Sequence, residues 1–157
     1  MKMLSGLLLS WLLLASGVHA AGFQLVSEAD LQRELQYQRS LPKDEIDELP
    51  MVTRSRFPAI RVLAPEVDAP HLTAPLRLQV TFETSSDARI LPQTFRALYG
   101  MLKLDITETL RRNAQLSEKG LLAESAGLPV GAHRLFLQVA DDRGRFTERE
   151  LRFRVGP

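Results

Sequence analysis

Alternating apolar and polar side chains dominate this sequence from about residue 59 to its end, and this pattern constrains the fold more than any other feature. In the stretch LRLQVTFET, residues 76–84, every second residue from Leu76 to Phe82 is apolar. Successive side chains of a strand point to opposite faces of a sheet, so the stretch predicts a strand with one buried face. Further alternating runs lie at residues 60–62, 95–99, 102–106, 135–139 and 151–155. Short strands of this kind, separated by Pro, Gly, Asp and Ser, predict a mainly β chain folded as an antiparallel β-sandwich over residues 59–157.

A short helix is predicted before the first of these strands. Ser27 and Asp30 have the spacing of a capping box, in which a serine and an acidic residue satisfy free groups at the start of a helix. The residue before Pro42 avoids the helical conformation. We therefore expect a helix over about residues 28–39.

The residues that follow this helix have a different character. Residues 41–58 contain three prolines, acidic and then basic side chains, and little periodicity. This composition favours a solvated linker. The alternative is a docking strip for a partner, with Ile46 and Leu49 as its anchors. Residues 21–58 are therefore expected to form an N-terminal helical arm and linker.

One stretch interrupts the alternation later in the chain. The sequence DITETLRRNAQLSEKG, residues 105–120, predicts a second short helix that Asp105 or Thr107 caps. Gly120 is its expected stop, because glycine accepts the conformation that ends many helices. We expect this helix on the rim of the sandwich rather than in its core.

The first residues predict export. Lys2 precedes an apolar run from Leu4 to about Ala15, and small and polar residues follow up to Ala20. This layout is typical of a secretory signal peptide, so we expect residues 1–20 to be removed by cleavage after Ala20. The apolar run is shorter than the stretch of about 20 residues that a membrane span needs. The protein is therefore expected to be periplasmic or secreted.

Composition narrows the classes of partner. The chain has no cysteine, so it has no site for lipid attachment and must fold without disulfides. It has 20 basic and 19 acidic residues, and the loss of Lys2 with the signal peptide balances the two, which argues against a nucleic-acid partner. No later apolar run has the length of a membrane span, so we expect no membrane insertion after signal removal. The oligomeric state stays open.

The stretch LPVGAHRLFLQVADDRG, residues 128–144, holds the strongest candidates for chemistry. His133 has the parity of the apolar residues that follow it, so it begins the inward-facing row of a strand. A histidine at such a place is expected to be partly buried and bonded to a neighbouring carbonyl rather than to act as a ligand or a catalyst. The four residues from Asp141 to Gly144 have the composition of a hairpin turn.

A calcium site is the alternative for this turn. Calcium takes about six to eight oxygen ligands, and the turn supplies only a few of them. The acidic residues that would have to join Asp141 and Asp142 are Asp87, Asp105, Asp68 and Glu66. His71 has no spacing relation to His133, and a zinc site requires more ligands than these two. The sequence therefore assigns no catalytic, cofactor-binding or metal-binding residue.

Motifs for other chemistries are missing from the sequence. It contains no nucleophile elbow, phosphate-binding loop or zinc-protease motif. A glycan-binding surface would need exposed aromatic rings, but the only tryptophan, Trp11, leaves with the signal peptide. Three phenylalanines are predicted to face the core: Phe82, Phe95 and Phe153. The aromatic residues that remain for such a surface are Tyr37, Phe57 and Phe146.

Five short motifs between residues 58 and 155 carry a resemblance to a known family. They are IRVLAP from Ile60, the strand at 76–82, LDIT from Leu104, the Leu-Pro-x-Gly-x-His pattern that ends at His133, and the Asp-x-x-Gly pattern that ends at Gly144. Through these motifs the chain resembles the bacterial immunoglobulin-like domains of exported proteins. The resemblance implies an immunoglobulin-like β-sandwich that serves as a binding or spacer module and names no ligand. The cysteine pair and core tryptophan of antibody domains are absent from the predicted mature chain.

Together these features predict an exported, non-enzymatic binding or scaffolding module. It is expected to act through protein–protein contacts with another envelope or secreted protein, made by the N-terminal arm or by an exposed edge strand. Two alternatives stay open: a calcium- or glycan-dependent adhesion module, and an accessory subunit of an exported enzyme. No cofactor is expected.

Overall fold

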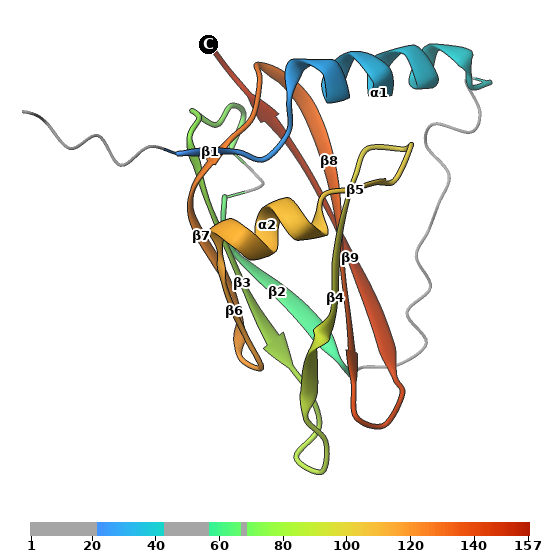
Figure 1. The fold of residues 1–157 in the computed structure, drawn as a ribbon, viewed down its shortest axis with the longest axis vertical. Coiled ribbons are helices and arrows are strands. Elements are labelled where there is room, and N and C mark those ends of the chain that lie inside the picture. The colour runs from blue at the N-terminus through green and yellow to red at the C-terminus, as the bar shows by residue number, and fades with distance from the viewer. Residues whose placement is uncertain (1–21, 43–56, 67–68) are drawn as a thin grey trace, which may run out of the picture.

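A computed structural model describes residues 22–42, 57–66 and 69–157 of the chain (Figure 1). The predicted signal peptide, the linker segment with Ile46 and Leu49, and Asp68 lie outside these residues. The described residues form a mainly β body of two sheets with two short helices, as the alternation predicted. In this part of the chain, no helix is both long and apolar enough to cross a membrane.

The strands divide between two sheets. Sheet A contains β1 (Phe23–Gln24), β2 (Ala59–Ala64), β3 (Leu76–Glu83), β6 (Gln115–Ser117) and β7 (Gly120–Gly127). Its order is β1-β7-β3-β2, and β6 also pairs with β7. Sheet B contains β4 (Ile90–Tyr99), β5 (Leu104–Asp105), β8 (Gly131–Asp141) and β9 (Phe146–Val155), in the order β5-β4-β8-β9. Among these strands only β1 and β7 pair in parallel.

One apolar core joins the inner faces of the two sheets. The rings of Phe82 on β3 and Phe95 on β4 lie 6.0 Å apart between their centroids, so the two sheets contact each other here. The alternation in β3 is confirmed: Arg77 is exposed, whereas every second residue from Leu76 to Phe82 is buried. Phe95 and Phe153, which were predicted to face the core, are buried too.

The first helix forms as predicted. Helix α1 spans Glu28–Ser40, and the Ser27 side chain accepts the backbone N–H of Asp30, whose carboxylate accepts the backbone N–H of Ser27. The residues just before α1 do more than lead into it. Leu25 and Val26 are buried in the core, and β1 is part of sheet A. Residues 22–26 are therefore part of the two-sheet body rather than of an arm beside it.

The second helix is shorter than predicted. Helix α2 spans Thr107–Asn113, and Gly120 is not its stop, since β6 intervenes and Gly120 begins β7. The predicted strand at residues 102–106 is reduced to the two residues of β5. α2 joins β5 of sheet B to β6 of sheet A along one side of the body (Figure 1), and its Leu110 is fully buried. The helix therefore lies on the rim, as expected, but one of its faces completes the core.

Strand β7 was not predicted. Its sequence, GLLAESAG, is rich in alanine and glycine, which have a low preference for strands. Backbone pairing with β3 on one side and with β6 and β1 on the other holds this segment in the sheet. Contacts distant in the sequence thus override the local preference of these residues.

Candidate functional site

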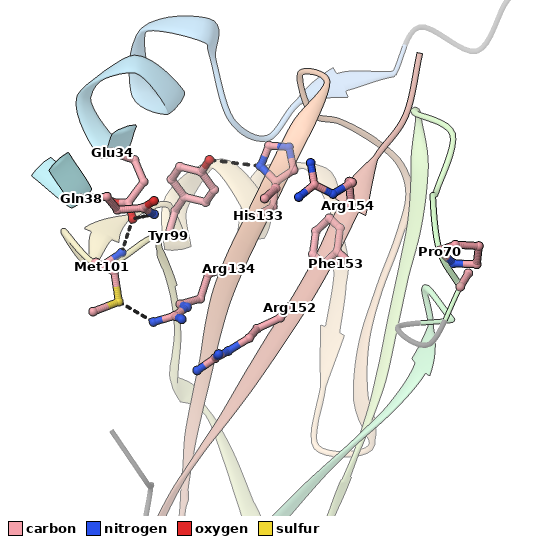
Figure 2. A pocket seen from close by; sticks show the side chains of 12 residues that line it. Glu34, Gln38, Pro70, Tyr99, Met101, His133, Arg134, Arg152, Phe153 and Arg154 are labelled. Carbon is pink, nitrogen blue, oxygen red and sulfur yellow. Dashed lines mark hydrogen bonds between the residues drawn. The ribbon is translucent and has the colours of Figure 1, made fainter. Parts of the chain in front are cut away.

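Helix α1 crosses the end of the body at which β8 begins, and a buried carboxylate holds it there (Figures 1 and 2). Glu34 is only 2 % exposed. Its Oε1 accepts the backbone N–H of Met101 at 2.6 Å, and its Oε2 accepts that of Leu102 at 3.0 Å. The side-chain amide of Gln38 donates to the same carboxylate at 2.6 Å. A carboxylate that receives three donors is strongly fixed, so Glu34 anchors α1 to the turn between β4 and β5.

The backbone of this turn is shaped to receive Glu34. Gly100 has φ +69°, a conformation that favours glycine, and a Cβ at this position would lie 2.2 Å from the Glu34 carboxyl carbon. On the other side of the turn, the Lys103 ammonium lies 3.1 Å from the ring centroid of Phe136 and pairs with Glu148. The turn that presents two N–H groups to Glu34 is therefore held from both sides.

Beneath α1, two buried polar side chains form a short chain of hydrogen bonds. His133 on β8 is 4 % exposed, and its Nε2 lies 2.8 Å from the carbonyl oxygen of Pro129. A carbonyl only accepts, so Nε2 carries the proton and donates. Nδ1 must then accept, and the Tyr99 hydroxyl, 3.1 Å away, donates to it. The prediction that His133 is buried and bonded to a neighbouring carbonyl is confirmed.

Burial sets the protonation of this pair. Desolvation lowers the pKa of His133, although the Pro129 carbonyl and the charge of Glu28 oppose the shift. For Tyr99, desolvation raises the pKa, and the negative charge of Glu34 raises it further. Both groups are therefore neutral near pH 7. Both ring nitrogens of His133 are thus bonded inside the protein.

A pocket of about 400 Å³ opens between α1 and the adjoining ends of β8 and β9, and we call it the α1 pocket (Figure 2). Its lining comes from two residues of α1, from the end of β4 and the turn after it, and from the segment before β3. The first residues of β8 and the last residues of β9 complete it. The lining residues are Glu34, Gln38, Ala69, Pro70, Tyr99, Met101, Ala132, His133, Arg134, Arg152, Phe153 and Arg154.

Arginine is the distinctive residue of this pocket. Arg134 and Arg152 stand directly opposite each other on β8 and β9, and Glu150 pairs with both, at 2.9 Å and 2.6 Å. Arg154 follows on the same side of β9, and its side chain is exposed. Among the described residues, no carboxylate pairs with the Arg154 guanidinium.

The opposite end of sheet B carries the predicted hairpin turn between β8 and β9 (Figure 1). Asp141 is 1 % exposed, and its Oδ1 accepts the backbone N–H groups of Arg143 and Arg145, each at 3.0 Å. Its Oδ2 accepts from the Arg145 guanidinium at 2.7 Å and from the Thr84 hydroxyl at 3.2 Å. Burial alone raises the pKa of Asp141, but these hydrogen bonds and the Arg145 charge outweigh it and lower the pKa. The oxygens of Asp141 are therefore filled by donors of the turn and by Thr84, which follows β3.

The remaining acidic candidates for a calcium site are dispersed among arginines. Asp87 pairs with Arg143, and Asp105 pairs with Arg96. Asp142 lies 3.8 Å from Arg89, and Glu66 is exposed. The described residues contain no group of three or more His, Asp or Glu side chains that could hold a metal ion. Calcium at the hairpin turn would have to displace the donors that already fill the oxygens of Asp141.

The other candidates also stay apart. His71 is exposed and precedes Leu72, which pairs with Val155 at the end of β9. Phe146 is 54 % exposed at the hairpin end of sheet B, whereas Tyr37 lies on α1 at the opposite end (Figure 1). These two rings form no common platform on which a sugar could stack.

The longer sheet edges carry features that oppose pairing with a further strand. On β9, Arg149 is exposed although it stands in the core-facing row that contains Leu151. On β2, the register shifts around Leu63. On β4, the Arg111 guanidinium donates to the carbonyls of Pro92, Gln93 and Phe95. Inward-facing charges, bulges and covered carbonyls are the devices by which edge strands avoid unwanted partners.

No protein-family model matches this chain, and no curated protein or solved structure matches it either. The site is therefore interpreted from its own geometry.

Sequence reasoning missed the residues that make the α1 pocket. Leu31, Glu34 and Gln38 have the spacing of one helical face, which was the available signal for Glu34. Arg152 and Arg154 occupy the outward row of a strand, where charged residues are ordinary, so no local signal marked them.

Proposed function

We propose that this chain is an exported, non-catalytic binding or scaffolding module of immunoglobulin-like fold, which contacts another envelope or secreted protein through the α1 pocket. The strand order supports the immunoglobulin-like assignment. Strands β2, β3, β7 and β6 follow one another as A, B, E and D do in one immunoglobulin sheet, and β4, β8 and β9 follow as C, F and G do in the other. Strand β5 beside β4 has the place of C′.

The α1 pocket is the observation that carries the proposed binding role. Arginine is enriched at protein interfaces, and Arg134, Arg152 and Arg154 line this pocket, whereas the rings of Tyr99 and Phe153 that also line it are buried. The pocket is also well ordered by its surroundings, because Glu34 fixes the helix above it. A rigid, preformed surface loses little conformational freedom on binding, which favours affinity.

A non-catalytic role is supported by the state of the two residues with the chemistry of an acid or base. Both ring nitrogens of His133 form hydrogen bonds, one with the Pro129 carbonyl and one with the Tyr99 hydroxyl, and burial keeps the ring neutral. A general base needs a free nitrogen within reach of a substrate proton. The pair therefore supports the wall of the pocket instead of acting on a ligand.

The sheet edges favour contact through the pocket over strand addition. β-augmentation needs a long, accessible edge, and here Arg149, the bulge at Leu63 and Arg111 each oppose it. Of the two modes that the sequence left open, docking near the N-terminal helix has the stronger support. Export to the envelope rests on the signal-peptide pattern of residues 1–20.

Site-specific photocrosslinking tests this function. A photoreactive residue replaces Ala132, which is exposed and lines the pocket, and in a matched protein it replaces Glu124, which is exposed on sheet A. Both positions are exposed, so substitution is expected to leave the fold intact, whereas deleting the N-terminal residues would remove Leu25 and Val26 from the core. Each full-length variant is expressed in its native host, irradiated in intact cells, and its adducts are identified by mass spectrometry.

The proposal expects a discrete adduct with one envelope or secreted protein from position 132 and none from position 124. The same adduct from both positions, or none from either, would contradict a binding function located at the α1 pocket.

A further inference from the structure

The turn between β4 and β5 has the build of an anion-binding site. Its consecutive backbone N–H groups at Met101 and Leu102 converge on one carboxylate, that of Glu34, at 2.6 Å and 3.0 Å. Figure 2 shows Glu34 of α1 beside the backbone of Met101. Successive N–H groups of a turn that point to the same side form a concavity that attracts anions. The chain thus supplies its own carboxylate to this site.

The close approach of the carboxylate depends on Gly100. A Cβ at this position would lie 2.2 Å from the carboxyl carbon of Glu34 and 2.2 Å from its Oε2. Glycine therefore leaves free the space that the carboxylate fills, as glycines do where a backbone approaches a ligand closely. The turn is shaped around a carboxylate group, whichever molecule carries it.

Sheet B holds this turn through contacts of its own. The Gly100 N–H donates to the carbonyl of Arg134 at 2.9 Å, and the Lys103 N–H donates to the carbonyl of Gly100 at 3.2 Å. The Lys103 ammonium pairs with Glu148 of β9 at 3.1 Å. None of these three contacts involves a residue of α1. We therefore expect the two N–H groups to keep their arrangement when the helix leaves, and a preformed site loses little freedom on binding.

Helix α1, by contrast, is held by few buried side chains. Of its thirteen residues, Leu31 and Glu34 alone are buried. The third donor to the carboxylate, Gln38, belongs to the same helix and leaves with it. Beyond Leu31, Glu34 is therefore the main contact that holds the helix on the turn, and a competing carboxylate can replace it there.

We propose that the turn at residues 100–102 is a binding site for small carboxylates, which Glu34 occupies in the free protein and which an external carboxylate takes when α1 lifts. A carboxylate bound by backbone N–H groups accepts charge-assisted hydrogen bonds, which are about twice as strong as those of a neutral acceptor. Glu34 and the ligand compete for the same two donors, so binding of one excludes the other. Because α1 forms one side of the α1 pocket, such a ligand also opposes binding of a partner there, and this consequence alone rests on the proposed function.

Acetate tests the site in a protein that lacks the built-in competitor. Glu34→Ala, labelled with ¹⁵N, is titrated with sodium acetate at constant ionic strength, and acetamide serves as the uncharged control of the same shape. The amide resonances of Met101 and Leu102 are expected to shift to saturation, with acetate binding at least about ten-fold more tightly than acetamide. Glu124→Ala, which removes an exposed carboxylate from sheet A and changes the net charge equally, should show no such shift.

Two further variants make the test specific. Gly100→Ala in the Glu34→Ala protein places a Cβ in the position of the carboxylate, so it is expected to weaken acetate binding at least about ten-fold. Glu34→Gln keeps the shape of the side chain and serves if Glu34→Ala does not fold. Acetate is expected to displace this neutral amide at a concentration at least about ten-fold lower than in the parent protein, with parallel shifts of the Leu31 and Gln38 resonances as α1 lifts.

Unshifted resonances of Met101 and Leu102 in both Glu34 variants, equal binding of acetate and acetamide, or undiminished binding after Gly100→Ala would overturn the proposal. These outcomes would leave the binding function at the α1 pocket standing, because photocrosslinking from position 132 measures it separately. Conversely, saturable acetate binding without any adduct from position 132 would retain the carboxylate site and remove the proposed function.

Discussion

The two ends of sheet B each bury one carboxylate, but these carboxylates find their partners at very different distances along the chain. Asp141, at the hairpin end, accepts the N–H groups of residues two and four positions away. Glu34, at the α1 end, accepts N–H groups 67 and 68 positions away. The backbone partners of Asp141 are therefore local, although the Thr84 hydroxyl also reaches it from 57 positions away, whereas both backbone partners of Glu34 are distant in the chain.

The two ends of sheet B also differ in what neutralises the charge of the buried carboxylate. At the hairpin end, Arg145 matches the charge of Asp141 within the same turn, and the side chains close the site. At the α1 end, Glu34 is held by two backbone N–H groups and the side-chain amide of Gln38. The hairpin end is filled by its own residues and by those around Thr84, and the end assembled from distant segments leaves the α1 pocket.

Removing Asp141 is expected to have the largest effect on stability. Asp141→Ala leaves two partly buried backbone N–H groups without their acceptor and the partly buried Arg145 without its counter-charge. We expect the free energy of unfolding to fall by about 3 kcal/mol, measured by urea denaturation. Asp142→Ala, which changes the adjacent exposed carboxylate, is expected to cost about 0.5 kcal/mol. Similar losses for the two variants would mean that Asp141 does not organise the turn.

Two glycines allow a sharper comparison of the ends. Gly100 and Gly144 have nearly the same φ, +69° and +73°, but a Cβ on Gly100 would meet Glu34 at 2.2 Å, whereas one on Gly144 would meet nothing within 4 Å. Gly144→Ala is expected to cost about 1 kcal/mol of unfolding free energy, which is the strain of the backbone alone. Gly100→Ala is expected to cost about 2 to 3 kcal/mol, because the collision adds to the strain.

Gly100→Ala in a Glu34→Ala protein isolates the contribution of the contact between the new Cβ and the Glu34 carboxylate. Glu34→Ala removes the three atoms nearest to the added Cβ, so Gly100→Ala should then cost only about 1 kcal/mol, as Gly144→Ala does. If the cost of Gly100→Ala is unchanged by Glu34→Ala, the helix is not anchored where the structure has it.

A smaller effect is expected from pH at the α1 end. The pKa of His133 is lowered in the folded state, so the unfolded chain takes up a proton first as the pH falls below the ordinary value of 6.5. The contribution of His133 is thus fully present above that value and is lost as the pH falls towards the folded pKa. Between pH 7.5 and 5.5, we expect the unfolding free energy to decrease by about 1 kcal/mol.

Two histidine variants test whether His133 causes this decrease in unfolding free energy. His133→Gln should remove the dependence on pH over this range, although the variant is less stable at every pH. His71→Gln, at an exposed position, should retain it. Retention of the full dependence in His133→Gln would place its origin elsewhere.

The contrast between the two ends also explains which features the sequence predicted. The hairpin turn, the capping box of α1 and the row that begins at His133 depend on residues close together in the chain, and each is confirmed. Gly120 was wrongly taken as the end of α2 because the residues between Asn113 and Gly120 have no strong preference, and pairing with β7 decides their structure.

The α1 pocket could not be predicted from residues close together in the sequence, because distant segments form it. No residue near Glu34 in the sequence indicates that its carboxylate will accept N–H groups from the turn after β4. The exposed Arg154 resembles any charged residue on a solvated face. Leu25 and Val26 likewise enter the core only because β1 pairs with the end of β7. Features of this kind follow from tertiary structure and require it.

Amide hydrogen exchange at Met101 and Leu102 tests most directly whether α1 is docked as described, on which the pocket and both proposals depend. In the parent protein these two amides should be protected, and in Glu34→Ala they should exchange at least about ten-fold faster while amides within β8 and β9 keep their rates. If both amides exchange equally fast in the two proteins, Glu34 does not hold the helix, and the account of the α1 pocket is wrong.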